Sequence, residues 1–123
     1  MILADTSVWV DHFRRESKPL THFLNLNRVL IHPLVIGELA CGNLKNRQQI
    51  LSLLKSLNSA PTVDHEEALY FLEKNKLMGK GVGFIDIQLL ASTALDSGIK
   101  LWSYDKRLNA IASDLGLAWS QKT

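Results

Sequence analysis

The sequence predicts an α/β fold in which a mainly parallel central sheet lies between two layers of helices, a three-layer α/β/α sandwich. Short apolar runs near residues 2–4, 28–32 and 99–103 alternate with longer segments of helical periodicity. A short apolar run between polar residues is typical of a strand buried on both faces. Strands that alternate with helices indicate a parallel sheet. Residues 1–123 are expected to form a single domain with its own core.

The first half of the chain is expected to contain two strands and four helices. A hydroxyl of Thr6 or Ser7 is placed to cap the first helix. Pro19 and Pro33 suit the first turn of a helix, and Gly42 suits the end of one. The strands are expected at residues 2–4 and 28–32, and the helices at about 8–14, 19–26, 33–40 and 50–57.

The second half shows equally clear start and stop signals. Asp64 and Glu67 form a capping-box variant that opens a helix. The glycine-rich segment 79–83 interrupts that helix, and residues 84–95 are apolar on nearly every side, as in a buried helix. Gly116 ends the last helix. Strands are expected at 60–63, 99–103 and 117–119, and a helix around 108–112.

Composition excludes several classes of protein. The formal charge of +2 and the pI of about 8.8 are mildly basic, which is compatible with binding nucleic acid. The single cysteine, Cys41, excludes an intramolecular disulfide and a cysteine-based zinc cluster, and it is expected to be a small buried side chain. No apolar run approaches the roughly 18 residues of a membrane span. A soluble, cytoplasmic protein with no membrane contact is therefore expected.

Four carboxylates occupy positions that a core disfavours. Asp5 follows the first apolar run, and Asp105 follows the run that ends near Ser103. Glu38 and Asp86 lie within apolar helical segments. Ligands of open parallel sheets bind in the crevice outside the carboxyl ends of the strands. One such crevice can collect all four acids.

Each acid also has a purely structural interpretation. The three aspartates can cap helices, and Glu38 can pair with Arg14 or Arg47. Gathered in one crevice, however, four carboxylates repel each other unless a cation lies between them. An all-oxygen ligand set suits Mg²⁺ or Mn²⁺ better than zinc. Ser7 and Ser103, each two residues from an acid, can hold a water molecule or a phosphate oxygen, or act as caps. Such a site suits phosphoryl-transfer hydrolysis.

At these motifs the chain resembles the PIN-domain ribonucleases, specifically the VapC-type toxins of type II toxin–antitoxin systems. Asp5-Thr6-Ser7 resembles the N-terminal signature of that family, and Glu38 resembles its mid-chain glutamate. Asp86 resembles its third acid, and Ser103-Tyr104-Asp105 its final Thr/Ser-x-Asp motif. Leu108 departs from the phenylalanine that the family often has there.

The resemblance implies a Mg²⁺-dependent endoribonuclease that hydrolyses RNA, with Mn²⁺ as an alternative ion. It implies that Asp5, Glu38, Asp86 and Asp105 are the catalytic and metal-binding acids, with Asp5 and Asp86 as the leading ligands. It also implies a homodimer and a cognate antitoxin protein that covers the cleft. Two other interpretations stay open, a receiver-type phosphoacceptor module and a non-catalytic RNA- or protein-binding PIN-like domain.

Overall fold

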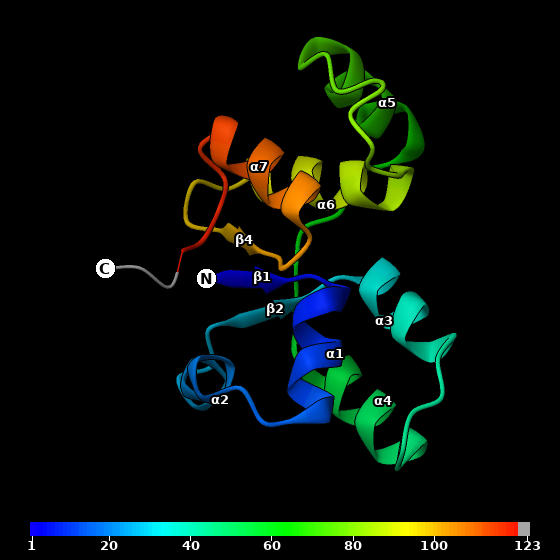
Figure 1. The fold of residues 1–123 in the computed structure, drawn as a ribbon, viewed down its shortest axis with the longest axis vertical. Coiled ribbons are helices and arrows are strands. Elements are labelled where there is room, and N and C mark those ends of the chain that lie inside the picture. The colour runs from blue at the N-terminus through cyan, green and yellow to red at the C-terminus, as the bar shows by residue number, and fades with distance from the viewer. Residues whose placement is uncertain (121–123) are drawn as a thin grey trace.

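The computed structural model describes residues 1–120, which contain four strands and seven helices. Figure 1 shows the sheet between α1, α2 and α4 on one side and α6 and α7 on the other, so the three-layer sandwich is confirmed. The strands are β1 (Ile2–Ala4), β2 (Val29–Ile31), β3 (Asn58–Ser59) and β4 (Lys100–Trp102). The helices are α1 (Thr6–Arg14), α2 (Lys18–Asn25), α3 (Pro33–Ala40), α4 (Arg47–Ser56), α5 (His65–Lys74), α6 (Phe84–Ala94) and α7 (Lys106–Asp114).

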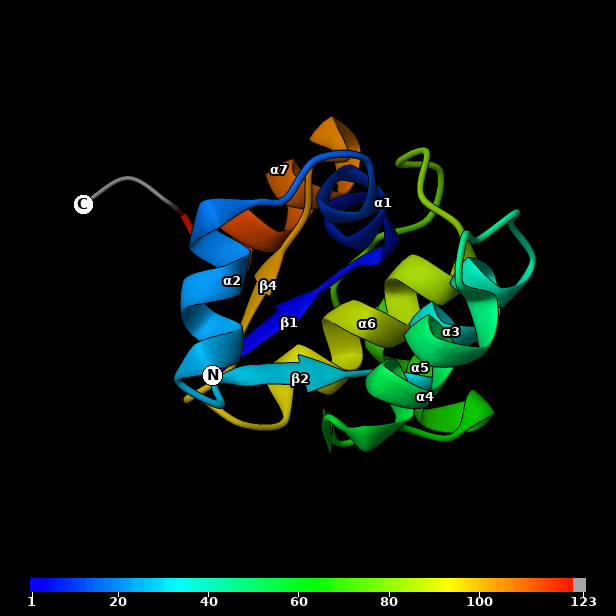
Figure 2. The ribbon, with the colours of Figure 1, turned by 90° about the horizontal axis from the view of Figure 1, so that it is seen from below.

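The sheet is entirely parallel, in the order β3-β2-β1-β4. Strand β1 is central, with Leu3 opposite Leu30 of β2 and Leu101 of β4. Figure 2 shows β1, β2 and β4 running side by side in the same direction. Because the strands are parallel, their carboxyl ends meet at one edge of the sheet. That edge carries the polar residues that follow the strands, Asp5, His32 and Ser103.

The core is formed by the sheet and the helices packed against it. Leu3 and Leu101 are fully buried in the sheet, and Leu54 of α4 and Leu90 of α6 are fully buried in the layers on either side. Helix α6 buries most of its length, as its apolar sequence predicts. No helix within residues 1–120 has the length and apolar character needed to cross a bilayer.

Two of the expected strands are shorter than predicted or displaced. The third strand is β3 rather than residues 60–63: the Ala60 N–H still donates to the carbonyl of Ile31, but Pro61 has no N–H with which to continue the ladder. Residues 117–119 form only one bridge, between Ala118 and Leu101, at the outer edge of β4.

Two local predictions about side chains are wrong. The cap of α1 is not a hydroxyl of Thr6 or Ser7 but Asp5, whose carboxylate accepts a hydrogen bond from the Val8 N–H, so the capping interpretation of Asp5 is correct. Cys41 is exposed, because it is the C-cap of α3, where the chain turns away from the core. The capping box of α5 is confirmed, with Asp64 and Glu67 each accepting from the other's backbone N–H.

Candidate active site

Asp5 occupies the centre of the carboxyl edge and is 5% exposed. One of its oxygens accepts from the Ser7 hydroxyl at 2.5 Å, and the other accepts from the Ser103 hydroxyl at 2.5 Å. Burial raises the pKa of Asp5, and the bonds from the two serine hydroxyls oppose that rise. Ser7 and Ser103 therefore orient Asp5 and stabilise its ionised form.

The segment after β4 is tied to Asp5 through the same two serines. The Tyr104 N–H donates to the Ser7 hydroxyl at 3.0 Å, and the Asp105 N–H donates to the Ser103 hydroxyl at 2.9 Å. Asp105 is exposed and caps α7 by accepting from the Leu108 N–H at 3.0 Å. The capping interpretation of Asp105 is thus correct, and the cap uses only one of its two oxygens.

Glu38 approaches from α3 on the other side of α1. Its carboxylate accepts from the Thr6 hydroxyl at 2.6 Å. Glu38 itself is exposed, and it lies beside the face with which α3 buries Val35 and Leu39. Within residues 1–120 it pairs with neither candidate arginine. Arg47 donates instead to the carbonyls of Ala40 and Gly42.

Asp86 lies in the first turn of α6 and is partly buried. It does not cap the helix, because Gly83 holds the N-cap position in extended backbone. Burial is the main cause that raises the pKa of Asp86 to about 6, and the negative charges of Asp105, Asp5 and Glu38 raise it further. The structure therefore brings the four acids close enough for their charges to act on one another.

The donor set fits a hard divalent cation by its chemistry. Four carboxylates, from the residue after β1, from α3, from α6 and from the segment after β4, supply only oxygen ligands, and a cation among them would relieve the repulsion on Asp86. Over the described part of the chain, however, no three His, Cys, Asp or Glu side chains are already grouped in a geometry that could hold a metal ion. The four acids lie in one region of the molecule, but their side chains are not arranged in a coordinating geometry.

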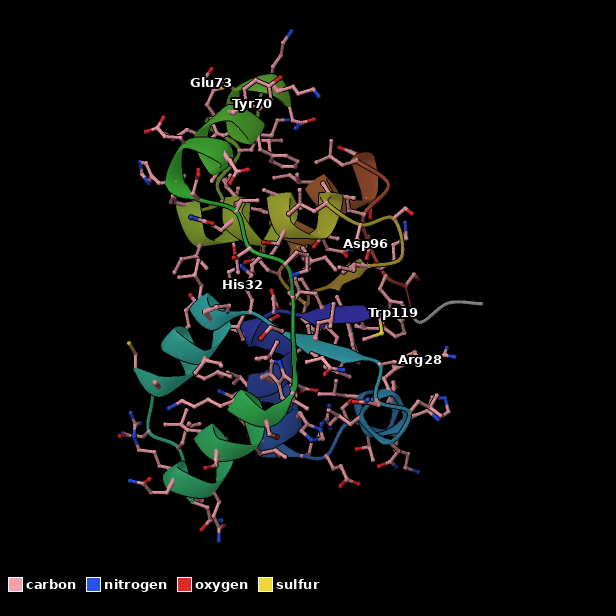
Figure 3. The ribbon with its side chains drawn as sticks, turned by 180° about the vertical axis from the view of Figure 1, so that it is seen from behind. Arg28, His32, Tyr70, Glu73, Asp96 and Trp119 are labelled. Carbon is pink, nitrogen blue, oxygen red and sulfur yellow. The ribbon has the colours of Figure 1, made fainter. Side chains whose placement is uncertain are left out.

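Two contacts that support the site were not predicted from the sequence. Thr6 holds Glu38, and buried His32 links the helices that carry Glu38 and Asp86 (Figure 3). The Nδ1 of His32 accepts from the Leu34 N–H at 3.1 Å and caps α3, while its Nε2 lies 3.2 Å from the Ser92 hydroxyl of α6. Because Nδ1 is an acceptor, the neutral ring carries its proton on Nε2 and donates it to Ser92. Burial lowers the pKa of His32, which favours this neutral form.

Two cavities open beside the acids. A cavity of about 700 Å³ includes Thr6 and Glu38 in its lining, and one of about 620 Å³ includes Ser7 and Tyr104. Both contact Arg14 of α1. A substrate that reaches the acids therefore has concave surface available next to them.

Comparisons with known proteins agree with this architecture. The family model described as PIN domain matches residues 2–114. The protein named Ribonuclease VapC32, from Mycobacterium tuberculosis strains CDC 1551 / Oshkosh and ATCC 25618 / H37Rv, is 43% identical over 122 residues. The aligned region covers 99% of this chain and 98% of that protein.

Proposed function

This chain belongs to the PIN-domain family, as a VapC-type member, and from that membership we propose that it is a toxin endoribonuclease that hydrolyses phosphodiester bonds of RNA. The similar protein is named a ribonuclease, and the similarity extends over nearly the whole of both chains. The observation that carries the proposal is the convergence of four carboxylates: burial is the main cause that raises the pKa of Asp86 to about 6, and the charges of the other three acids add to it. Such convergence is costly without a cationic partner.

The four acids would hold a divalent cation, Mg²⁺ or alternatively Mn²⁺. Asp5 and Asp86 are the leading ligands, and Glu38 and Asp105 complete the acidic set. When bound, such a cation supplies a more acidic water and stabilises charge on the phosphate. The role of Ser7 and Ser103 is to keep Asp5 ionised and oriented through their 2.5 Å bonds.

The partners follow from the same membership. The substrate would be RNA, and a cognate antitoxin protein would inhibit the enzyme. A single-domain protein that forms a homodimer in the cytoplasm is the assembly expected of such a toxin. The PIN match over residues 2–114 argues against a receiver-type phosphoacceptor module.

RNA cleavage by the purified protein, with and without Mg²⁺, tests the proposal. Asp5→Asn should reduce cleavage by more than about a hundredfold, because even the loss of a group that only orients a metal ligand costs about 10- to 100-fold. Asp114→Asn, the same change at an exposed position at the end of α7, should cleave like the wild type. Circular dichroism should show that both variants are folded.

Three results would contradict the proposal. Undiminished cleavage in EDTA would exclude the divalent cation, and full activity of Asp5→Asn would exclude the acidic site. Metal-independent binding of RNA without cleavage would instead favour a non-catalytic domain.

A further inference from the structure

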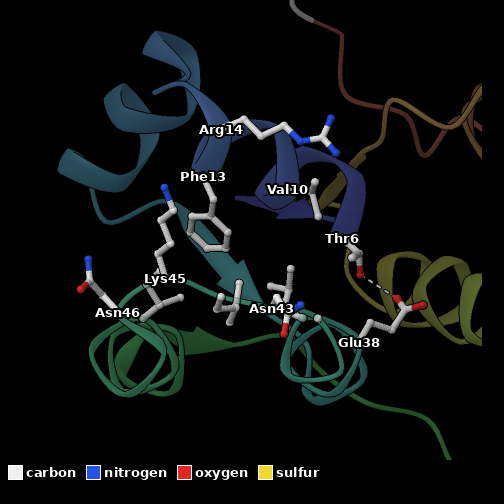
Figure 4. Close-up of a pocket in the computed structure, with 12 residues that line it drawn as sticks. Thr6, Val10, Phe13, Arg14, Glu38, Asn43, Lys45 and Asn46 are labelled. Carbon is white, nitrogen blue, oxygen red and sulfur yellow. Dashed lines mark hydrogen bonds between the residues drawn. The ribbon is translucent and has the colours of Figure 1, made fainter.

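The larger cavity begins at the acidic site and extends away from it between α1 and the connection from α3 to α4. Thr6 and Glu38 form its end at the acids, and the 2.6 Å bond between them joins its two walls. Figure 4 shows the Phe13 ring pointing from α1 toward the wall formed by the α3–α4 connection. The volume of about 700 Å³ lies within the range of about 300–1,000 Å³ typical of small-molecule sites.

The lining combines an apolar floor with two polar side chains, Asn43 and Lys45, that have no partner within residues 1–120. Val10 and Phe13 of α1 face Leu39 of α3 across the floor. Asn43 and Lys45 belong to the α3–α4 connection, and neither side chain makes a hydrogen bond or ion pair with any of residues 1–120. These groups are available to a ligand.

The α3–α4 connection is held in place by contacts of its own. The Arg47 guanidinium donates to the carbonyl of Ala40 at 2.6 Å and to that of Gly42 at 3.2 Å. Asn46 closes the connection in the left-handed region, with φ of 54°, and its side chain does not cap α4. The wall that carries Asn43 is therefore formed before any ligand arrives.

An unpaired nucleotide matches this arrangement. Proteins recognise unpaired bases in RNA by stacking them on aromatic rings and by hydrogen bonding to their edges. Phe13 offers the ring, the Asn43 amide offers a donor and an acceptor, and Arg14 and Lys45 offer charge to phosphates. If the bond to be cut lies at the acids, the adjoining nucleotide reaches the cavity that begins at Glu38.

We propose that this cavity binds one unpaired nucleotide of the RNA, next to the scissile bond, and that Asn43 reads the edge of its base. The inference rests on the proposed ribonuclease function and adds a determinant of its sequence preference. A protein segment is the other candidate occupant. A nucleotide is favoured because it combines a base edge for the Asn43 amide with phosphates for Arg14 and Lys45.

The test is cleavage, with Mg²⁺, of an RNA library that carries a randomised single-stranded segment, followed by sequencing of the product ends. The wild type should prefer one base at a position beside the cut. Asn43→Ala should weaken that preference by about tenfold, as expected for a lost hydrogen bond to the base edge. Phe13→Leu should lower kcat/KM by about tenfold or more through lost stacking. Asn25→Ala, at an exposed asparagine of α2 outside the cavity, is the matched control and should change neither quantity.

The outcomes separate the inference from the function on which it rests. A wild type that cuts no RNA would overturn the proposed function, and this inference with it. A wild type that cuts without base preference, or an Asn43→Ala variant with unchanged preference, would overturn the inference alone. If the variants cut with wild-type preference but lose an inhibitor protein, the cavity belongs to a protein partner. Because Asn43 is exposed, Asn43→Ala should fold even where Phe13→Leu does not.

Discussion

The acidic site has two halves that are built differently. The strand half consists of Asp5, Ser7, Ser103 and Asp105, which are joined by hydrogen bonds among side chains and backbone N–H groups. The helix half consists of Glu38 on α3 and Asp86 on α6. There, Glu38 accepts one hydrogen bond from the Thr6 hydroxyl, and Asp86 accepts one from the backbone N–H of Gly83.

This difference determines at which acid the ionised carboxylate is less well stabilised. At Asp5, hydrogen bonds from two hydroxyls and from backbone N–H groups oppose the effect of burial. At Asp86, three carboxylates add to the effect of burial, and only the Gly83 N–H opposes them. The strand half is thus a finished hydrogen-bonded network, while the helix half keeps a repulsion that a cation can relieve.

The largest expected effect on stability comes from breaking the strand half. Ser103→Ala removes a donor to Asp5 and leaves that buried carboxylate with one hydroxyl partner. The free energy of unfolding should fall by about 1–3 kcal/mol, the usual cost of an unsatisfied buried polar group. Urea denaturation followed by circular dichroism measures it.

Thr6→Ala is the matched change in the helix half. It removes the hydroxyl bound to Glu38, but Glu38 is exposed and water can replace the bond. The free energy of unfolding should change by less than about 0.5 kcal/mol. Equal losses in the two variants would mean that the halves are not built differently.

An effect smaller than that of Ser103→Ala, and of opposite sign, is expected from Asp86→Asn. In the folded state the pKa of Asp86 is about 6, compared with an ordinary value of 3.8, so the folded protein holds this proton more tightly than the unfolded chain does. The wild type therefore loses stability as the pH rises from about 4 to above 6. The variant does not, so at pH 7.5 without metal it should be more stable by about 1–2 kcal/mol, after allowance for solvent screening.

Denaturation of both proteins at pH 4 and at pH 7.5 tests this prediction. The difference in stability should be present at pH 7.5 and absent at pH 4. A variant that is less stable than the wild type at both values would show that Asp86 is held by favourable contacts rather than by a balance of repulsions.

The smaller of the two pH-dependent effects concerns His32, which joins the two helices of the helix half. Burial lowers the pKa of His32 below its ordinary value of 6.5, so the unfolded chain binds this proton more tightly. Its contribution to stability is complete above pH 6.5 and decreases as the pH falls below that value. His32→Asn keeps a residue suited to capping α3 but cannot titrate. Its free energy of unfolding should depend less on pH between 5 and 7, by less than about 1 kcal/mol. If the free energy of unfolding of His32→Asn depended on pH as strongly as that of the wild type, His32 would not be the group responsible for this pH dependence.

The sequence predicts the strand half better than the helix half. Asp5 and Asp105 follow apolar runs, and parallel strands bring such residues to one edge whatever the details of packing. The exposure of Glu38 and the bond between His32 and Ser92 depend on how helices far apart in sequence pack, which periodicity does not specify. The Thr6–Glu38 bond likewise depends on how two helices far apart in sequence pack together. The end of the third strand, in contrast, is determined by a local feature of the sequence, because Pro61 has no N–H with which to continue the hydrogen bonds to β2.

The position of β1 in the sheet has a consequence for synthesis on the ribosome. Strand β1 emerges before the other three strands, yet one of its two partners is β4, and Ser103, one of the two serines that donate to Asp5, lies 98 residues further along the chain. A nascent chain that has exposed Asp5, Glu38 and Asp86 still lacks β4, Ser103 and Asp105. Long-range parallel pairing of this kind forms late. The acidic site is therefore completed only after the segment from β4 to Asp105 has emerged, so a chain that ends before β4 carries three of the acids without the bond that Ser103 donates to Asp5.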